Sequence, residues 1–319
     1  MKRDLLSIAD LSRSDIEAIF ALARTLKRAL AAGRPHQRLA GRGAAMIFEK
    51  PSLRTRVTFE IGISQLGGSA VYLAPGDIRL GERESVADIA RNLARWVDLI
   101  VARTFSHDVL VELARNATVP VVNALSDREH PCQVLADCFT LIEKRKRLAG
   151  LKVAFVGDGN NMVHSLMLAA TRLGIDFRLA CPGGYEPDGA LVSEARRSTK
   201  GRVTITHSVA EAVAGADVLY TDVWTSMGQE AEVASRREAF RGYQLNDETL
   251  ALAKPGALVM HCLPAHRGDE ITDSVLDGPQ SIVLDQAENR LHVQKAIMVW
   301  LASFARRGRG GPSRRKRTR

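Results

Sequence analysis

The sequence predicts an α/β protein built from two doubly wound parallel-sheet domains with an active-site cleft between them. Short apolar runs alternate with helical patterns along the whole chain, which is typical of parallel sheets covered by helices. The alternation starts again after Gly150, so the second half repeats the architecture of the first. The 319 residues also correspond to about two domains of ~150 residues each.

The first half opens with an amphipathic helix over residues 10–32, followed by a buried strand at 44–48. Ser52 then stands where a helix N-cap would stand, and Val57, Ile61 and Ile63 form the apolar stripe of the helix that follows. Further strands are expected at 70–73, 99–102 and 119–122.

A helix starting at Pro131 is expected to connect the two halves, because Pro favours the first helical position and apolar residues follow at helical spacing. A last helix, at about 290–305, is expected to pack back on the first domain. The predicted domains are therefore 1–131 and 132–289, with a basic, disordered tail at 306–319. Strands of the second domain are expected at 152–156, 177–180, 203–206, 218–221, 257–260 and 282–284.

Composition restricts the class of protein. Apolar residues make up 45% and charged residues 25%, as in ordinary globular proteins. The four cysteines form no CxxC pair, so we expect neither disulfides nor a metal site, and no cofactor. No signal peptide and no apolar run of ~18 residues is evident, which predicts a cytoplasmic protein without membrane contact.

The net charge of +9 comes almost entirely from the tail, which holds eight arginine and lysine residues. The remaining chain is close to neutral. A nucleic-acid partner is therefore not favoured, and the tail is interpreted as a solvated segment, with polyanion binding as the alternative.

Five polar regions follow expected strands, at 50–56, 102–106, 127–133, 157–162 with 222–228, and 261–268. Ligands of parallel α/β folds bind outside the carboxyl ends of the strands, so these regions should converge on one cleft. Ser52, Arg54, Thr55 and Arg56 surround a helix N-terminus, which predicts an anion pocket. Arg103 ends an apolar strand, where a buried guanidinium is costly unless it meets an anion.

The GDGNNM segment at 157–162 first suggests a dinucleotide loop. Its third glycine position is Met162, however, and no acidic residue ends the next strand, so a dehydrogenase is the weaker interpretation. Asn160 and Asn161 instead offer amides for an amino-acid head group. His130 and Gln133 could bind a small carbonyl, and Cys262 is either a nucleophile or an inert thiol.

Together, the segments FEKPSLRTRVTFE, HPCQ, GDGNNMVHS, DVWTSMGQE and HCLPAHRG resemble, in order, the motifs of the aspartate and ornithine carbamoyltransferase family. The resemblance spans residues 4 to 304. The DxxxSMG and HCLP segments match the ornithine branch. The resemblance implies a transferase of arginine biosynthesis that moves the carbamoyl group of carbamoyl phosphate to the δ-amine of L-ornithine, giving L-citrulline and phosphate. N-acetylornithine, putrescine and aspartate are rival acceptors, and an NAD-dependent dehydrogenase is the alternative from another class.

The family also implies a carbamoyl-phosphate domain (1–131), an ornithine domain (132–289), and a homotrimer with active sites between subunits. Two positions depart from the family pattern: Leu53 replaces a common threonine, and Arg79 stands where a neighbouring subunit commonly supplies Gln or His. The implied carbamoyl-phosphate residues are Ser52, Leu53, Arg54, Thr55, Arg79, Arg103, His130, Gln133, Cys262, Leu263 and Arg290. The implied catalytic residues are Arg103, His130, Cys262 and Arg290. The implied ornithine residues are Asn161, Asp222, Ser226 and Met227.

Overall fold

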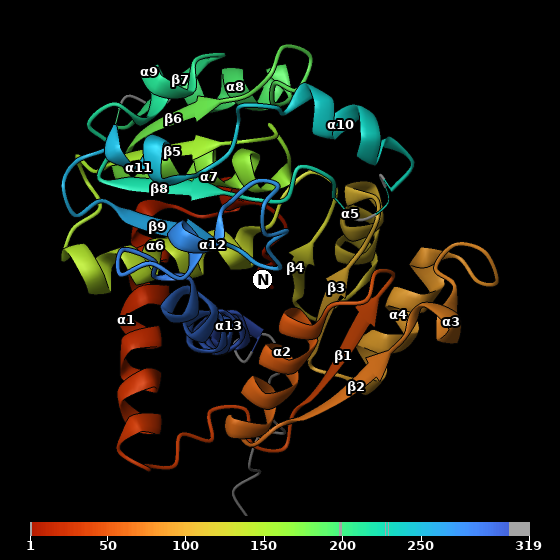
Figure 1. Cartoon of the computed structure of the whole chain (residues 1–319). Helices are drawn as coiled ribbons and strands as arrows, with labels where there is room; N and C mark the ends of the chain where they lie inside the picture. Colours follow the sequence, from red (N-terminus) through yellow and green to blue (C-terminus); the bar gives the residue numbers. More distant parts are fainter. Residues whose placement is uncertain (1, 198–199, 227, 229, 306–319) are drawn as a thin grey trace, which may run out of the picture.

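The computed structural model describes residues 2–197, 200–226, 228 and 230–305, and contains two parallel sheets (Figure 1). The predicted fold class is confirmed. The first sheet has the order β2-β1-β3-β4, with strands Gly43–Phe48 (β1), Ser69–Leu73 (β2), Leu99–Arg103 (β3) and Val121–Leu125 (β4). The second has the order β7-β6-β5-β8-β9, with strands Lys152–Val156 (β5), Asp176–Ala180 (β6), Arg202–Thr206 (β7), Val218–Thr221 (β8) and Leu258–His261 (β9).

Helices cover both sheets, and several begin on a serine whose hydroxyl accepts a backbone N–H, as at Ser12 and Ser52. The first half contains Arg13–Ala31 (α1), Leu53–Gln65 (α2), Pro75–Ile78 (α3), Val86–Trp96 (α4) and His107–Asn116 (α5). Pro131–Arg145 (α6) follows. The second half contains Asn161–Leu173 (α7), Gly189–Arg196 (α8), Val209–Val213 (α9), Val233–Ala239 (α10), Asp247–Ala251 (α11), Asp273–Leu276 (α12) and Val283–Ala305 (α13), with short 3-10 helices at Ile8–Asp10 and Glu230–Glu232.

Strands β1, β3 and β4 of the first sheet are buried on both faces, which explains their continuous apolar sequence, whereas the edge strand β2 is partly exposed. In β1, for example, Met46 and Phe48 join the main apolar cluster, whereas Ile47 joins a second cluster beneath α4 and α5. Packing on both faces of β1 therefore fixes the position of its carboxyl end, where the site residues follow.

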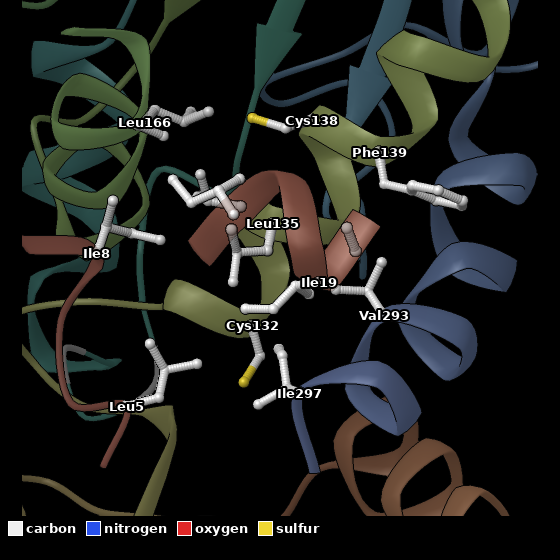
Figure 2. Packing of buried hydrophobic residues seen from close by; sticks show 14 of the residues in the cluster. Leu5, Ile8, Ile19, Cys132, Leu135, Cys138, Phe139, Leu166, Val293 and Ile297 are labelled. Carbon is white, nitrogen blue, oxygen red and sulfur yellow. The ribbon is translucent and has the colours of Figure 1, made fainter. Parts of the chain in front are cut away.

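The main apolar cluster continues from one half of the chain into the other. Figure 2 shows Leu135, Cys138 and Phe139 of α6 packed among Ile19 of α1 and Val293 of α13. Helix α13 contacts α1, α2 and α6, so the last helix of the chain returns to the first half (Figure 1). This packing places the middle of α13 beside the N-termini of α2 and α6.

Two local predictions are wrong. The strand expected at 282–284 is the start of α13, and the neighbouring Ser281 forms only an isolated bridge with Val259. The prediction for the apolar stripe of α2 is wrong in part. Ile63 is buried as expected, but Val57 and Ile61 are exposed, and Phe59 is buried in their place. Within the described ranges, no helix is long and apolar enough to span a membrane.

Candidate active site

The carboxyl ends of both sheets open into one cleft of about 1030 Å³. All five polar regions predicted from the sequence contribute to its wall, so their expected convergence is confirmed. Representative lining residues from these regions are Arg54, Arg103, His130, Asn161, Asp222 and Cys262.

One end of the cleft is the N-terminus of α2. The hydroxyl of Ser52 accepts the backbone N–H of Thr55 at 3.3 Å, which confirms Ser52 as the helix cap. Arg290, from the middle of α13, donates from Nη2 to the hydroxyl of Thr55 at 2.7 Å. The positive end of the helix dipole, Arg54 and Arg290 therefore face the same space.

Three guanidinium groups gather here: Arg103 and Arg290 are buried, and Arg54 is half-buried. Arg103 is 7% exposed and Arg290 is 3% exposed. Burial, followed by the charges of Arg290 and Arg54, lowers the pKa of Arg103 to about 10. Burial likewise lowers the pKa of Arg54 and of Arg290, and Nε of Arg290 has no hydrogen-bond partner among the described residues. Such a cluster favours an anion of high charge density, because an anion relieves the mutual repulsion.

His130 and Gln133 enter the cleft from the start of α6. His130 occupies the N-cap position without using its ring as a cap, and its backbone N–H donates to Ser165 at 2.9 Å. Burial, then the charges of Arg290 and Arg103, hold the pKa of His130 well below its ordinary value, so the ring is neutral. Gln133 donates from Nε2 to Asp137 at 2.8 Å, which leaves its amide oxygen unpaired within the described part of the chain.

The opposite end of the cleft is organised around Asp222, which follows β8. Its carboxylate accepts hydrogen bonds from Asn160 Nδ2 at 3.3 Å and from the Cys262 thiol at 2.9 Å. Asn161 donates from Nδ2 to the carbonyl of Ser126 at 2.7 Å. A carboxylate beside one amide, with a second amide in the wall of the same cleft, suits the ammonium and carboxylate groups of an amino acid.

Cys262 is not activated as a nucleophile. Burial, followed by the charge of Asp222, raises the pKa of its thiol well above the ordinary value. The ring of the adjacent His261 is engaged elsewhere, since Nδ1 accepts the N–H of Leu263 at 2.8 Å and Nε2 faces Glu270 at 3.0 Å. Asp222, His261 and Cys262 place possible metal ligands within 4.8 Å of one another, but each is already hydrogen-bonded. That the protein needs no metal or cofactor stays a prediction.

Most of the site residues predicted from the sequence lie in the cleft. Ser226 and Leu263 line it, and Leu263 adopts a left-handed backbone with a φ of 58°. Arg79 is the exception among the described candidates, because it ends α3 and does not line the cleft of its own chain. Met227 lies outside the described residues.

The sequence did not point to Arg236 of α10. Its Nη1 donates to Asp158 at 2.9 Å, and both side chains are buried in the cleft wall. The pair joins positions 78 residues apart, so no local pattern could have signalled it.

The GDGNNM loop differs from a dinucleotide site in structure as well as in sequence. Asn160 caps α7 by accepting the N–H groups of Met162 and Val163, so the helix N-terminus is already occupied. A Cβ atom at Gly159 would lie 2.4 Å from the backbone nitrogen of Pro187, which shows how closely the following loop covers this turn. The dehydrogenase alternative is not favoured.

Two family models match the chain. The carbamoyl-phosphate-binding domain of aspartate/ornithine carbamoyltransferase matches residues 3–143, and the aspartate/ornithine-binding domain matches residues 149–301. The ornithine carbamoyltransferase of Methanoculleus marisnigri is 54% identical over 94% of this chain and 97% of its own length. That of Thermococcus kodakarensis is 51% identical over 93% and 95%.

Solved structures agree with these matches. Ornithine carbamoyltransferase from Pyrococcus furiosus superposes with a TM-score of 0.90 at 50% identity, over 93% of this chain and 96% of the other. The anabolic enzyme from Campylobacter jejuni gives a TM-score of 0.90 at 36% identity, over 95% and 100%. The chain therefore belongs to the aspartate/ornithine carbamoyltransferase family.

Proposed function

We propose that the protein transfers the carbamoyl group of carbamoyl phosphate to the δ-amine of L-ornithine, forming L-citrulline and phosphate. The observation that carries this function is the single cleft that joins an arginine-rich anion pocket to the amino-acid hollow around Asp222. The relatives at about half identity are named ornithine carbamoyltransferases, which supports ornithine over the rival acceptors.

Carbamoyl phosphate is assigned to the end of the cleft formed by α2, β3 and α13. Ser52, Arg54 and the N-terminal amides of α2 hold the phosphate, and its charge offsets the repulsion among the arginines. Arg103 and neutral His130 donate hydrogen bonds to the carbamoyl oxygen. The free amide oxygen of Gln133 accepts from the carbamoyl NH₂ group.

Ornithine is assigned to the opposite end. Asn161, Asp222, Ser226 and Met227 bind its α-amino and α-carboxylate groups, with Asp222 as the partner of the α-amino group. Cys262 and Leu263 lie beside the side-chain amine, and the protonated thiol keeps the Asp222 carboxylate in place. This assignment favours an acceptor with a free α-amino group, which N-acetylornithine and putrescine lack.

The neutral δ-amine attacks the carbamoyl carbon, so a C–N bond forms and the carbonyl oxygen becomes an oxyanion. The bond between carbon and the phosphate oxygen then breaks, and the proton lost by nitrogen goes to the departing phosphate. Arg103 and His130 stabilise the oxyanion, at a few kcal/mol each. With a pKa near ~10.4, only about one amine in 10³ is neutral at pH 7. The nearby arginines favour that neutral form because they repel a cation.

We also propose a homotrimer whose subunits share active sites. Leu53, Val57 and Ile61 form one exposed apolar stripe on α2, with exposed fractions of 74%, 47% and 46%, and Tyr72 of the edge strand β2 lines the same surface hollow. An apolar stripe of this size on a helix and a neighbouring strand is typical of a contact surface. It starts at the cleft, so a second copy seated there could bring its Arg79 to the phosphate.

The stripe explains the departure at Leu53, whose side chain lies on the proposed contact surface while its N–H stays at the helix N-terminus. Val57→Asp should convert the trimer to monomers in analytical ultracentrifugation and lower activity. Val233→Asp, at an exposed apolar residue of α10, is the matched control. A wild-type protein that sediments as a monomer would contradict the proposed assembly.

Citrulline formation tests the reaction itself. Ornithine is compared with putrescine, N-acetylornithine and aspartate at equal carbamoyl phosphate, and ornithine should give the highest kcat/KM. Citrulline at background level with ornithine would refute the proposal. Two relatives are named anabolic, which supports a role in arginine biosynthesis, and we place the protein in the cytoplasm.

A further inference from the structure

A buried carboxylate lies one helical turn behind Gln133, outside the cleft. Asp137 is 1% exposed, and its two oxygens accept three hydrogen bonds. Oδ1 accepts from Gln133 Nε2 at 2.8 Å and from Gln286 Nε2 at 2.8 Å, and Oδ2 accepts from the hydroxyl of Tyr220 at 2.9 Å. These groups come from α6, α13 and β8.

This carboxylate determines which end of the Gln133 amide faces the cleft. Burial raises the pKa of Asp137 to about 6, so the carboxylate is mostly ionised at pH 7. An ionised carboxylate only accepts hydrogen bonds, so the NH₂ group of Gln133 turns toward Asp137. The amide oxygen then points away from Asp137, and it is buried without a partner in the part of the chain that the structure describes. An NH₂ group on a ligand is what this oxygen lacks.

Asp137 is itself fixed by the elements that carry the rest of the site. Gln286 cannot reverse its amide, because its oxygen accepts the backbone N–H of His261 at 3.1 Å. His261 directly precedes Cys262, and Gln286 lies one turn before Arg290. Tyr220 of β8 lies two positions before Asp222, which follows that strand. One carboxylate therefore links Gln133 to both ends of the cleft.

We propose that Asp137 is a positioning residue that holds the Gln133 amide oxygen toward the carbamoyl NH₂ group of bound carbamoyl phosphate. The inference rests on the proposed function and goes beyond it, because Asp137 touches no substrate. Loss of the Asp137 carboxylate should therefore weaken binding of the carbamoyl group alone. If Asp137 served only in packing, its loss would weaken binding of the carbamoyl and phosphate groups together.

The test compares Asp137→Leu with Asp137→Asn by calorimetric titration with carbamoyl phosphate and, separately, with inorganic phosphate. In Asp137→Leu the Gln133 NH₂ group loses its acceptor, while Gln286 and Tyr220 still bond each other at 2.9 Å. The Kd for carbamoyl phosphate should rise about 10- to 100-fold, with the Kd for phosphate unchanged within about twofold. In Asp137→Asn the amide oxygen still accepts from both glutamines, so both Kd values should stay within about threefold.

A folded Asp137→Leu protein with wild-type affinity for carbamoyl phosphate overturns the inference, as does an equal loss for both ligands or an equal loss in Asp137→Asn. Should Asp137→Leu fail to fold, neutron diffraction of the wild-type protein decides: deuterons on the Gln133 atom facing Asp137 support the inference, and deuterons on the cleft-facing atom overturn it. A wild-type protein that binds no carbamoyl phosphate would overturn the proposed function itself.

Discussion

Replacing Arg103 with methionine should stabilise the ligand-free protein while it removes carbamoyl-phosphate binding. The pKa of Arg103 falls from 12.5 to about 10, chiefly by burial and then by the charges of Arg290 and Arg54. One unit of pKa corresponds to ~1.4 kcal/mol, so the charged form costs the folded state about 3 kcal/mol. Arg103 is charged at pH 7 in the folded and the unfolded states alike, so this cost applies in full there.

Methionine is nearly as long as arginine and keeps the apolar packing of the stem. We expect the free energy of unfolding to rise by about 1–3 kcal/mol and Tm by several degrees, since lost hydrogen bonds offset part of the gain. The Kd for carbamoyl phosphate should rise by at least about 10², because a buried charge opposite the ligand is lost. Differential scanning calorimetry measures the first effect, and titration calorimetry measures the second.

Arg91→Met is the matched control, since Arg91 lies exposed on α4 and its ion pair with Asp88 is solvated. This control should change both the Tm and the Kd very little. An Arg103→Met protein that is less stable than wild type and binds carbamoyl phosphate as tightly would refute the reasoning. That result would mean that the arginine cluster stabilises the fold and does not bind an anion.

Three further results are expected. Asp222→Asn should raise KM for ornithine about 10²-fold and leave the Kd for carbamoyl phosphate within about twofold, as read by steady-state kinetics and calorimetry; equal losses for both would contradict two separate half-sites. Cys262→Ser should keep at least about a tenth of kcat, because a hydroxyl can replace the thiol as donor to Asp222, and complete inactivity with intact folding would indicate a covalent role. The pKa of His130 lies well below 6.5, so the imidazole should cause no break in the pH profile above that value. Between about pH 6.5 and 7.5, where the α-amino group stays charged, kcat/KM for ornithine should rise about tenfold per pH unit, following the neutral δ-amine. A plateau in this range would exclude the mechanism.

The convergence of the polar segments could be predicted because it depends on topology. Parallel strands place their carboxyl ends at one edge of their sheet, so residues after β1 and β3 must lie together, as must those after β5 and β8, wherever the exact strand limits fall. Ser52 could be predicted too, since a helix cap is a local pattern. These predictions needed no knowledge of side-chain partners.

Two kinds of feature could not be predicted. Helical periodicity shows that Val57 and Ile61 lie on one stripe, but it does not say whether the stripe faces the core of the chain or another molecule. The three apolar residues at 282–284 are too short a run to distinguish a strand from a helix. In the structure they lie at the start of α13, which packs against α6. Partners distant in sequence, such as Arg236 and Asp158, leave no local pattern at all.

The arrangement of α13 connects stability with function in this protein. Its apolar residues Val293 and Ile297 are buried in the main core, which fixes the helix against α6 and α1. The same helix carries Arg290, whose burial beside Arg103 and Arg54 is unfavourable without an anion. Apolar packing of ~1.5–3 kcal/mol per large side chain is therefore what keeps a repulsive cluster assembled before the ligand arrives. A site prepared in this way binds an anion without reorganising, and it loses that advantage when the core of α13 is weakened far from the cleft.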